Sequence, residues 1–282
     1  MTEQNRTDRA IQGFLDSLSQ LPGSILYRDQ YEWMAIAPTA EGQVLRLDAD
    51  LKPVWLPPPA GSTEPLQSLS PLYWFDVSQE GWSDGETPTA LTDFGANHKD
   101  LQRVRGAAAY DQAQGHLVFD GITDVFQHPP AIREEVKQPL TFVIVAEFPE
   151  SNATQHFFDA GTSARSSWRN LLYESGAAPG ELSLYGDSRA ETGSALPFPR
   201  AVYIIESDYP AADVFRDGVS LSTPNWGNNP QYNMTLGNSL DDPPGFNGRM
   251  NFCELAMLGY ILNAPEKSDL TAALINKWEI TP

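Results

Sequence analysis

The last strand-like segment of the chain is apolar on both of its alternating faces. Residues 250–261 read MNFCELAMLGYI. The two faces carry Met250, Phe252, Ala256, Leu258 and Tyr260 on one side, and Cys253, Leu255, Met257 and Ile261 on the other. A strand with two apolar faces has to be covered on both sides, so we expect it in the middle of a packed sheet.

A helix start signal follows this strand directly. Asn263 can cap a helix, Pro265 falls in the first turn, and Glu266 stands where it completes a capping box. Apolar residues then recur every three or four positions, which predicts one apolar stripe that docks on the sheet. The stripe consists of Leu270, Ala273, Leu274 and Trp278.

Composition narrows the functional classes. The chain has 282 residues, enough for one sizeable sandwich domain plus an appendage, and a formal net charge of −19. Nucleic acid requires a basic face, so this charge argues against nucleic acid as a partner. The sequence shows no basic and apolar leader and no apolar run of about 18 residues, so we expect neither secretion nor membrane insertion. The single cysteine, Cys253, predicts a small buried hydrophobe and no intrachain disulfide.

The first 22 residues predict a helical anchor. Ile11, Phe14, Leu18 and Leu21 recur at spacings of three and four, the pattern of a short coiled coil. About two heptads cannot hold a helix in water without a partner. The stripe therefore needs copies of itself or a groove on another protein, and the alternative is a helix folded back on its own domain.

Residues 23–57 predict a small β-module. The expected strands are residues 25–28, 32–37, 43–47 and 54–56. So short a segment buries little core per copy, which favours intertwining with neighbouring copies, and Trp33 would pack at such a subunit contact. Residues 58–70 contain three prolines and four serines or threonines, and they predict a linker between this module and the rest of the chain.

The module resembles one that is frequent in phage tail and fibre proteins. The pieces that carry the resemblance come in the order GSILYR, W, AP, GQVLRL and PVW. In that family such modules precede receptor-binding domains and are typically trimeric. The resemblance implies a homotrimer whose N-terminal helix contacts other virion proteins.

Residues 71–282 are similar to the concanavalin A-like lectin/glucanase superfamily, with the LamG-like jelly rolls as the closest branch. PLYWFDVS at 71–78 resembles the opening strand of these domains, and FNG…ELAMLGYILNAPEK resembles their closing strand and C-terminal helix. Residues at the family's characteristic places are Asp93, Gly95, Asn97, Leu101, Phe119, Asp120, Gly121 and Asp124. The strand-like pieces between are residues 140–148, 156–175, 180–187, 200–221 and 232–240. The resemblance implies an all-β protein, a jelly-roll β-sandwich behind a short helix and a small β-module.

Glycoside hydrolysis is the enzymatic alternative, because glucanases share this fold. It needs two carboxylates across the scissile bond, which retaining members of the superfamily carry as E-x-D-x-x-E on one strand. The nearest match is Glu206 with Asp208, but the third acid is missing and Pro210 interrupts the strand. Glu254 is expected to be a buried structural carboxylate bonded to backbone or arginine. The four histidines are scattered and no G-x-S-x-G elbow occurs, so we expect no catalysis.

Calcium is the one metal for which the sequence offers candidate ligands. The spacings H-x-x-x-H and C-x-x-C are absent, so the sequence predicts no cofactor and no transition-metal site. Many relatives carry a structural calcium ion, and the oxygen-rich loops at Asp120 to Asp124 and at Asp241-Asp242 could hold one. Solvated acidic turns are the alternative for these loops.

Sugar binding without chemistry requires aromatic faces flanked by polar groups. Three loop tryptophans meet this description. They are Trp82 with Asp84, Trp168 with Asn170, and Trp226 with Asn228. The alternative for each is a tryptophan that packs its loop onto the sandwich, as we expect for Trp74 and Trp278 in the strands and helix.

The two resemblances together imply a bacteriophage virion structural protein, a tail fibre, head fibre or spike, whose lectin-like domain binds host-surface glycan during host adsorption. The protein would be made in the host cytoplasm and reside in the virion. A purely structural decoration protein and a glycan-depolymerising tailspike hydrolase are the two alternatives.

Overall fold

The structure is a computed structural model that divides into two compact units, Met1–Glu64 and Pro65–Pro282. The residues that it describes are 25–28, 33–36, 44–47, 53–56, 64–132, 134–149, 155–159, 170–174, 181–185, 189–195, 197–222, 231, 234–238 and 248–281. The predicted helical anchor, with Ile11, Phe14, Leu18 and Leu21, lies outside these residues.

The described residues of the first unit form two antiparallel strand pairs. Their strands are β1 (Ile25–Arg28) with β2 (Trp33–Ile36), and β3 (Val44–Leu47) with β4 (Pro53–Leu56). The four strands coincide with those expected from the sequence to within a residue or two. Alternating apolar residues between polar turns are therefore enough to locate short hairpin strands here.

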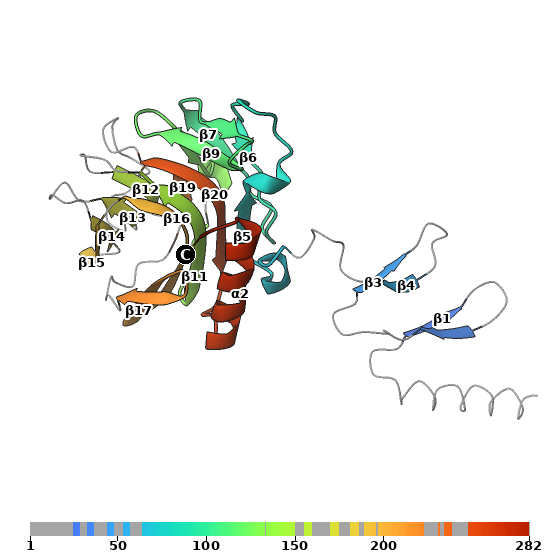
Figure 1. Ribbon diagram of the computed structural model, residues 1–282. Helices are drawn as coiled ribbons and strands as arrows, with labels where there is room; N and C mark the ends of the chain where they lie inside the picture. The colour runs from blue at the N-terminus through green and yellow to red at the C-terminus, as the bar shows by residue number, and fades with distance from the viewer. Residues whose placement is uncertain are drawn as a thin grey trace, which may run out of the picture. The chain divides into compact units, whose positions relative to one another are not determined.

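The second unit is a sandwich of two antiparallel sheets (Figure 1). One sheet has the order β15-β14-β13-β12-β19-β10-β7-β6, and the other has the order β18-β17-β16-β11-β20-β9-β8, with β5 also paired to β20. The strands of the first sheet are β6 (Ala90–Leu91), β7 (Leu101–Arg105), β10 (Val125–Gln127), β12 (Gln155–Asp159), β13 (Asn170–Glu174), β14 (Glu181–Tyr185), β15 (Arg189–Ala195) and β19 (Thr235–Leu236). Those of the second sheet are β5 (Tyr73–Asp76), β8 (Ala109–Asp111), β9 (His116–Asp120), β11 (Leu140–Phe148), β16 (Phe198–Asp208), β17 (Ala211–Arg216), β18 (Val219–Ser222) and β20 (Arg249–Leu258). Three short 3-10 turns lie among the described residues: η1 (Gln67–Leu69) before β5, η2 (Val77–Gln79) after β5, and η3 (Pro130–Ile132) between β10 and β11.

Strand β20 occupies the centre of its sheet. It pairs with β11 along one edge, and with β9 and β5 along the other. All residues from Phe252 to Leu258 are buried. The prediction that this segment is an inner strand covered on both faces is confirmed, and Cys253 is fully buried as expected.

The core lies between the two sheets and is rich in phenylalanine. Phe142 of β11 meets Phe158 of β12 with ring centroids 5.8 Å apart, and Phe119 of β9 meets Phe126 of β10 at 5.9 Å. Each pair joins the two sheets in an edge-to-face arrangement, the geometry that aromatic quadrupoles favour.

Helix α2 (Ala264–Lys277) covers the opposite face of the β20 sheet (Figure 1). Its capping box is present, since the Glu266 amide donates to Asn263 Oδ1 at 3.0 Å and the Asn263 amide donates to Glu266 Oε2 at 2.8 Å. Of the predicted stripe, Leu270, Leu274 and Trp278 are buried and Ala273 is half-buried. None of the helices in the described ranges is long and apolar enough to span a membrane.

The structure explains why Asp93 and Gly95, two residues of the segment 91–126, stand where they do. The Asp93 carboxylate accepts the backbone amides of Trp74, Gly95 and Lys99 at 2.7–2.9 Å, so it fixes the loop that follows β6 against β5. A Cβ at Gly95 would lie 2.8 Å from the Tyr73 Cα, so only glycine fits there. These characteristic positions therefore serve the packing of the sandwich.

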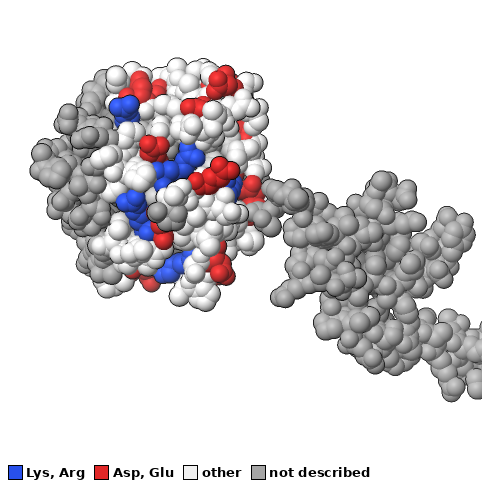
Figure 2. Space-filling model, in the orientation of Figure 1, with Lys and Arg blue, Asp and Glu red and all other residues white. Residues whose placement is uncertain are grey.

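Charged side chains are mixed over the face of the sandwich seen in Figure 2. Lysine and arginine alternate with aspartate and glutamate among the described residues, and neither sign forms a continuous patch on this face. Electrostatic recognition on this face therefore has to come from local clusters of side chains.

Candidate functional site

The loop that carries Trp82 is held against the edge strand β8. The Gly85 amide donates to the Tyr110 carbonyl, and the Tyr110 amide donates to the Glu86 carbonyl, both at 2.8 Å. The Gln112 amide adds a bond of 3.1 Å to Asp84 Oδ1. The loop thus continues the sheet by a short ladder, which fixes the position of its side chains.

Trp82 lies edge-to-face on Tyr110, with ring centroids 5.8 Å apart and ring planes at 71°. Both rings are half-buried, and each packs on the core with one side. Polar groups border the pair, because Asp84 and Gln112 are exposed and Asp111 is half-exposed. We call this surface the Trp82 platform, made of Trp82, Tyr110, Asp84, Asp111 and Gln112. An indole held in this way offers a fixed apolar surface beside hydrogen-bond acceptors, which is the combination that sugar rings require.

Among the described residues, nothing places the other predicted glycan-binding residues at the Trp82 platform. Trp168, Trp226 and Asn228 lie outside the described residues. Asn170 begins β13 and Trp33 begins β2, but only their backbones are described. These assignments stay predictions.

Glu254 sits at the centre of a buried hydrogen-bond network. Its Oε1 accepts the indole N–H of Trp74, and its Oε2 accepts that of Trp278, both at 2.7 Å. The Lys277 ammonium lies 3.1 Å from Glu254 Oε2 and 2.6 Å from Asp76 Oδ2. The expectation of a buried structural carboxylate is confirmed, but the expected partners, backbone or arginine, are wrong. Two indoles and a lysine take their place.

Burial governs the charge state of this network. Loss of solvent, followed by the neighbouring Asp76 charge, raises the pKa of Glu254 to about 7 against the opposing effects of Lys277 and the two indole donors. A sequence signal could have pointed to this network. Glu254 is an acid within an apolar strand, and Trp74 and Trp278 were both expected to be structural.

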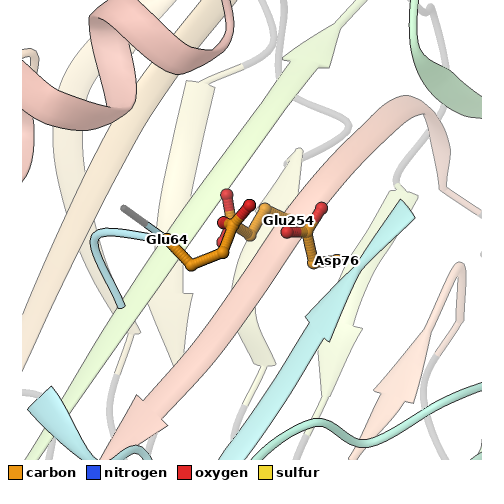
Figure 3. Close-up of side chains that lie close together, drawn as sticks. All are labelled: Glu64, Asp76 and Glu254. Atoms are coloured by element: carbon orange, nitrogen blue, oxygen red, sulfur yellow. The ribbon is translucent and has the colours of Figure 1, made fainter. Parts of the chain in front are cut away.

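The carboxylates of this network are also close enough together to be considered for a metal ion. Figure 3 shows Asp76 and Glu254 on neighbouring strands, together with Glu64, which directly precedes the sandwich in the chain. The Asp76 and Glu254 carboxylates approach within 4.8 Å of each other. The partly buried Lys277 ammonium already bonds both carboxylates, so a metal ion would have to displace this cation, and the residues do not fit one.

The acidic loop considered for calcium is held by protein donors. Asp120 accepts the amide and the hydroxyl of Thr123, each at 2.8 Å, and Asp124 accepts the Ala107 amide at 2.7 Å. These bonds close the turns by themselves, so calcium at this loop stays an untested prediction. Residues 241–242 lie outside the described part of the chain.

The acids considered for hydrolysis line a second surface. Strand β16 ends at Asp208, and Pro210 lies in the turn before β17, so the E-x-D-x-x-E pattern would place its third acid at Ala211. Glu206 lies opposite Asp213 of β17, and Lys267 of α2 bonds Glu206 Oε2 at 3.0 Å. A cavity of about 330 Å³, which we call the acid pocket, is lined by Glu206, Asp208, Ala211, Ala212, Asp213 and Ile261.

Comparisons with known proteins identify the fold. No family model matches the chain, and no curated protein matches it in sequence. Solved structures do match. A Trypanosoma rangeli sialidase in complex with 2,3-difluorosialic acid has 14% identity and a TM-score of 0.53 over 73% of this chain, which spans 33% of the sialidase. Domain 4 of a GH43 extracellular arabinanase from Geobacillus stearothermophilus, in complex with arabinotriose, has 17% identity and a TM-score of 0.51 over 72% of this chain and 98% of that domain.

A third similar structure is the binding domain of botulinum neurotoxin serotype D, with 6% identity and a TM-score of 0.53 over 75% of this chain and 53% of that one. At these identities the similarities show the fold, an all-β sandwich of the jelly-roll kind. The predicted fold class is confirmed.

Proposed function

We propose that the second unit is a carbohydrate-binding domain and that the Trp82 platform contacts the sugar. The observation that carries this proposal is the half-exposed indole, fixed on Tyr110 by a backbone ladder and bordered by Asp84 and Asp111. The similar sialidase and arabinanase structures, both described with bound sugars, support the choice of ligand class.

The physical basis is the two-sided nature of a sugar ring. Its C–H groups pack on an aromatic face, while its hydroxyls donate to carboxylates at the rim. The platform supplies both kinds of contact on a support that the fold has already ordered, so little entropy is lost on binding. A single shallow contact of this kind is weak, and several copies on one particle would multiply it.

The test is a glycan array with the full chain, followed by titration calorimetry with the sugar that binds. Trp82→Ala is expected to weaken binding at least tenfold, about 1.4 kcal/mol. Tyr209→Ala is the matched control, because Tyr209 is 51% exposed and lies away from the platform in the β16–β17 turn. Equal binding by wild type and Trp82→Ala would contradict the proposed site.

We propose further that this domain binds without hydrolysing. The acid pocket lacks the third carboxylate of the glucanase pattern, since Ala211 stands in its place. The full chain should therefore release no reducing ends from a polysaccharide that it binds. Release that disappears in Glu206→Gln would establish the hydrolase alternative.

The role as a virion appendage rests on the sequence pattern of residues 23–57. We propose a tail fibre, head fibre or spike in which residues 1–57 mediate trimer formation and contact other virion proteins. Mass photometry of the full chain against a variant lacking residues 1–60 tests the assembly, with a trimer expected only for the full chain. Equal monomer masses would contradict trimer formation, and with it the support for a fibre or a spike.

A further inference from the structure

The carboxylates around the Trp82 platform keep oxygens available for a ligand. Asp84 and Glu86 are exposed, and Asp111 is half-exposed. Each uses one oxygen to accept a backbone amide of its own turn or of the neighbouring segment: Asp84 Oδ1 at 3.1 Å, Asp111 Oδ1 and Glu86 Oε2 at 3.0 Å. The second oxygen of each makes no hydrogen bond with any described residue. Solvent-exposed acceptors therefore border the aromatic pair.

The main chain ties these acids to the two rings. Asp84 and Glu86 flank Gly85, whose amide donates to the Tyr110 carbonyl, and Asp111 directly follows Tyr110. The Glu86 carbonyl in turn accepts the Tyr110 amide. With neighbouring strands about 5 Å apart, each carboxylate lies within about 10 Å of the aromatic pair. That is roughly the distance over which a charge acts at physiological salt.

No cation compensates this negative charge within the described part of the chain. None of its lysines or arginines forms an ion pair with the three carboxylates. The guanidinium groups that bond to the two segments donate to main-chain carbonyls instead, Arg103 to that of Thr87 at 3.1 Å and Arg200 to that of Gln114 at 2.9 Å. A ligand at the platform therefore meets carboxylates without a positive partner.

The phenol of Tyr110 reports the sign of this surrounding. Burial raises the pKa of Tyr110, and the charges of Asp76 and Asp111 act in the same direction. Asp76 is paired with Lys277, whereas Asp111 has no such partner among the described residues. Surroundings that oppose a phenolate at the platform also oppose the carboxylate of an arriving ligand.

We propose that the Trp82 platform selects uncharged sugars and rejects acidic sugars, uronic and sialic acids among them. This inference rests on the proposed function, carbohydrate binding at Trp82, and adds the charge of the ligand. The free carboxylate oxygens accept the hydroxyl protons of a neutral sugar in charge-assisted bonds. A sugar carboxylate brings no proton to such an oxygen and is repelled by it. Recognition of a carboxylate favours the two-pronged donor of an arginine, and the platform contains none.

The test compares sugars that differ in charge at one carbon. The full chain is titrated by NMR with methyl β-D-glucopyranoside and methyl β-D-glucuronide, and with methyl β-D-galactopyranoside and methyl β-D-galacturonide. Within each pair the ring stays the same and a hydroxymethyl group becomes a carboxylate. We expect the neutral member of at least one pair to bind about five times or more tightly than its acidic counterpart at low salt. The ratio should shrink in about 0.5 M salt, because salt screens the repulsion.

A gain of binding keeps the test independent of folding. The double variant Asp84→Asn/Asp111→Asn keeps the oxygens that accept the backbone amides, so the loop and its ladder are preserved. It should bind the acidic sugar about three times or more tightly than the wild type does. The chain as a whole carries a net charge of −19, so the control Asp208→Asn/Asp269→Asn removes two exposed acids outside the platform and should leave the ratio unchanged.

The outcomes separate this inference from the proposed function. An acidic sugar that binds as tightly as its neutral counterpart, and loses its binding in Trp82→Ala, would overturn the charge selection and leave the glycan site standing. Binding of none of the four sugars, or no gain in the double variant, would also overturn the charge selection. The glycan site itself fails only if no sugar on the array binds, or if binding survives Trp82→Ala.

Discussion

Glu254 and Glu206 are two glutamates of one sheet, each bonded to a lysine of helix α2, and they differ in what surrounds them. Glu254 has both oxygens occupied by indole donors and Lys277. Glu206 has one oxygen on Lys267, while its other oxygen has no hydrogen bond among the described residues. A glutamate and a lysine thus belong to a fully hydrogen-bonded network, the closed network, at one end of α2. At the other end a glutamate and a lysine border the acid pocket, where one carboxylate oxygen has no donor, and we call this glutamate the open carboxylate.

The two glutamates therefore differ in how much they contribute to the stability of the fold. A carboxylate with every lone pair occupied holds elements together, because each donor it loses becomes an unsatisfied buried group. A carboxylate with one oxygen left without a donor adds less to folding. Substitutions at the two carboxylates and at the tryptophans test this difference.

Removal of the Glu254 carboxylate should have the largest effect on the free energy of unfolding. Glu254→Ala leaves the indole N–H groups of Trp74 and Trp278 without an acceptor and takes one anion from Lys277. We expect a loss of about 3–5 kcal/mol in the free energy of unfolding, measured by urea titration at pH 7. Glu86→Ala, at an exposed loop residue, is the control and should cost less than about 1 kcal/mol. A loss below 1 kcal/mol for Glu254→Ala would mean that the network does not hold the helix.

The pH dependence of stability should come next. The pKa of Glu254 is about 7 in the folded protein, above its ordinary value of 4.5, so between these pH values the folded state binds a proton that the unfolded state has lost. The free energy of unfolding must then fall as pH rises through this window, by about 1–3 kcal/mol for this group.

The measurement is urea unfolding at four pH values from 4.5 to 8 for wild type and Glu254→Gln. The variant cannot titrate at this position, so the difference between the two profiles isolates the glutamate. Parallel profiles would show that Glu254 keeps an ordinary pKa in the fold.

The two classes of tryptophan should respond differently to loss of size and of the indole N–H. Trp278→Phe removes a donor from buried Glu254 and should cost about 1–3 kcal/mol in unfolding. Trp82→Phe keeps an aromatic ring on a half-buried loop and should cost less than about 1 kcal/mol. Equal costs in thermal unfolding would place Trp82 among the structural tryptophans and weaken the glycan proposal.

The open carboxylate should give the smallest change in stability. Glu206→Gln keeps the shape of the side chain and gives up one partly exposed ion pair with Lys267, so we expect a change within about 1 kcal/mol by urea titration. Glu254→Gln, the same substitution in the closed network, should cost more. A larger loss for Glu206→Gln would show that the acid pocket is a structural element after all.

Much of this fold follows from local sequence patterns. The inner strand β20 was predictable because both of its faces are apolar, and the start of α2 because Asn263 and Glu266 form a capping box. Strand β15 was missed, since RAETGSA lacks the alternating apolar residues that identify a strand. The run at 91–126 matched a family pattern without revealing that it forms the strands β6 to β10.

The partners at the sites could not be predicted in this way. Trp74 and Glu254 are 180 residues apart in the chain, and Glu206 and Lys267 are 61 apart. No local period links such residues, because their contact depends on which strands the sheet brings side by side and where the helix docks. The candidate Trp82 was found because it lies in a polar loop beside Asp84, but its support, Tyr110 on β8, needed the structure.

The central claim is that the sandwich binds carbohydrate through Trp82. The most direct test is calorimetry of the full chain with the sugar selected on a glycan array, for wild type, Trp82→Ala and Tyr209→Ala in parallel. Our account predicts a loss of at least tenfold for Trp82→Ala and none for Tyr209→Ala, with both variants folded. Binding that survives Trp82→Ala unchanged, or no binding to any sugar on the array, would contradict it.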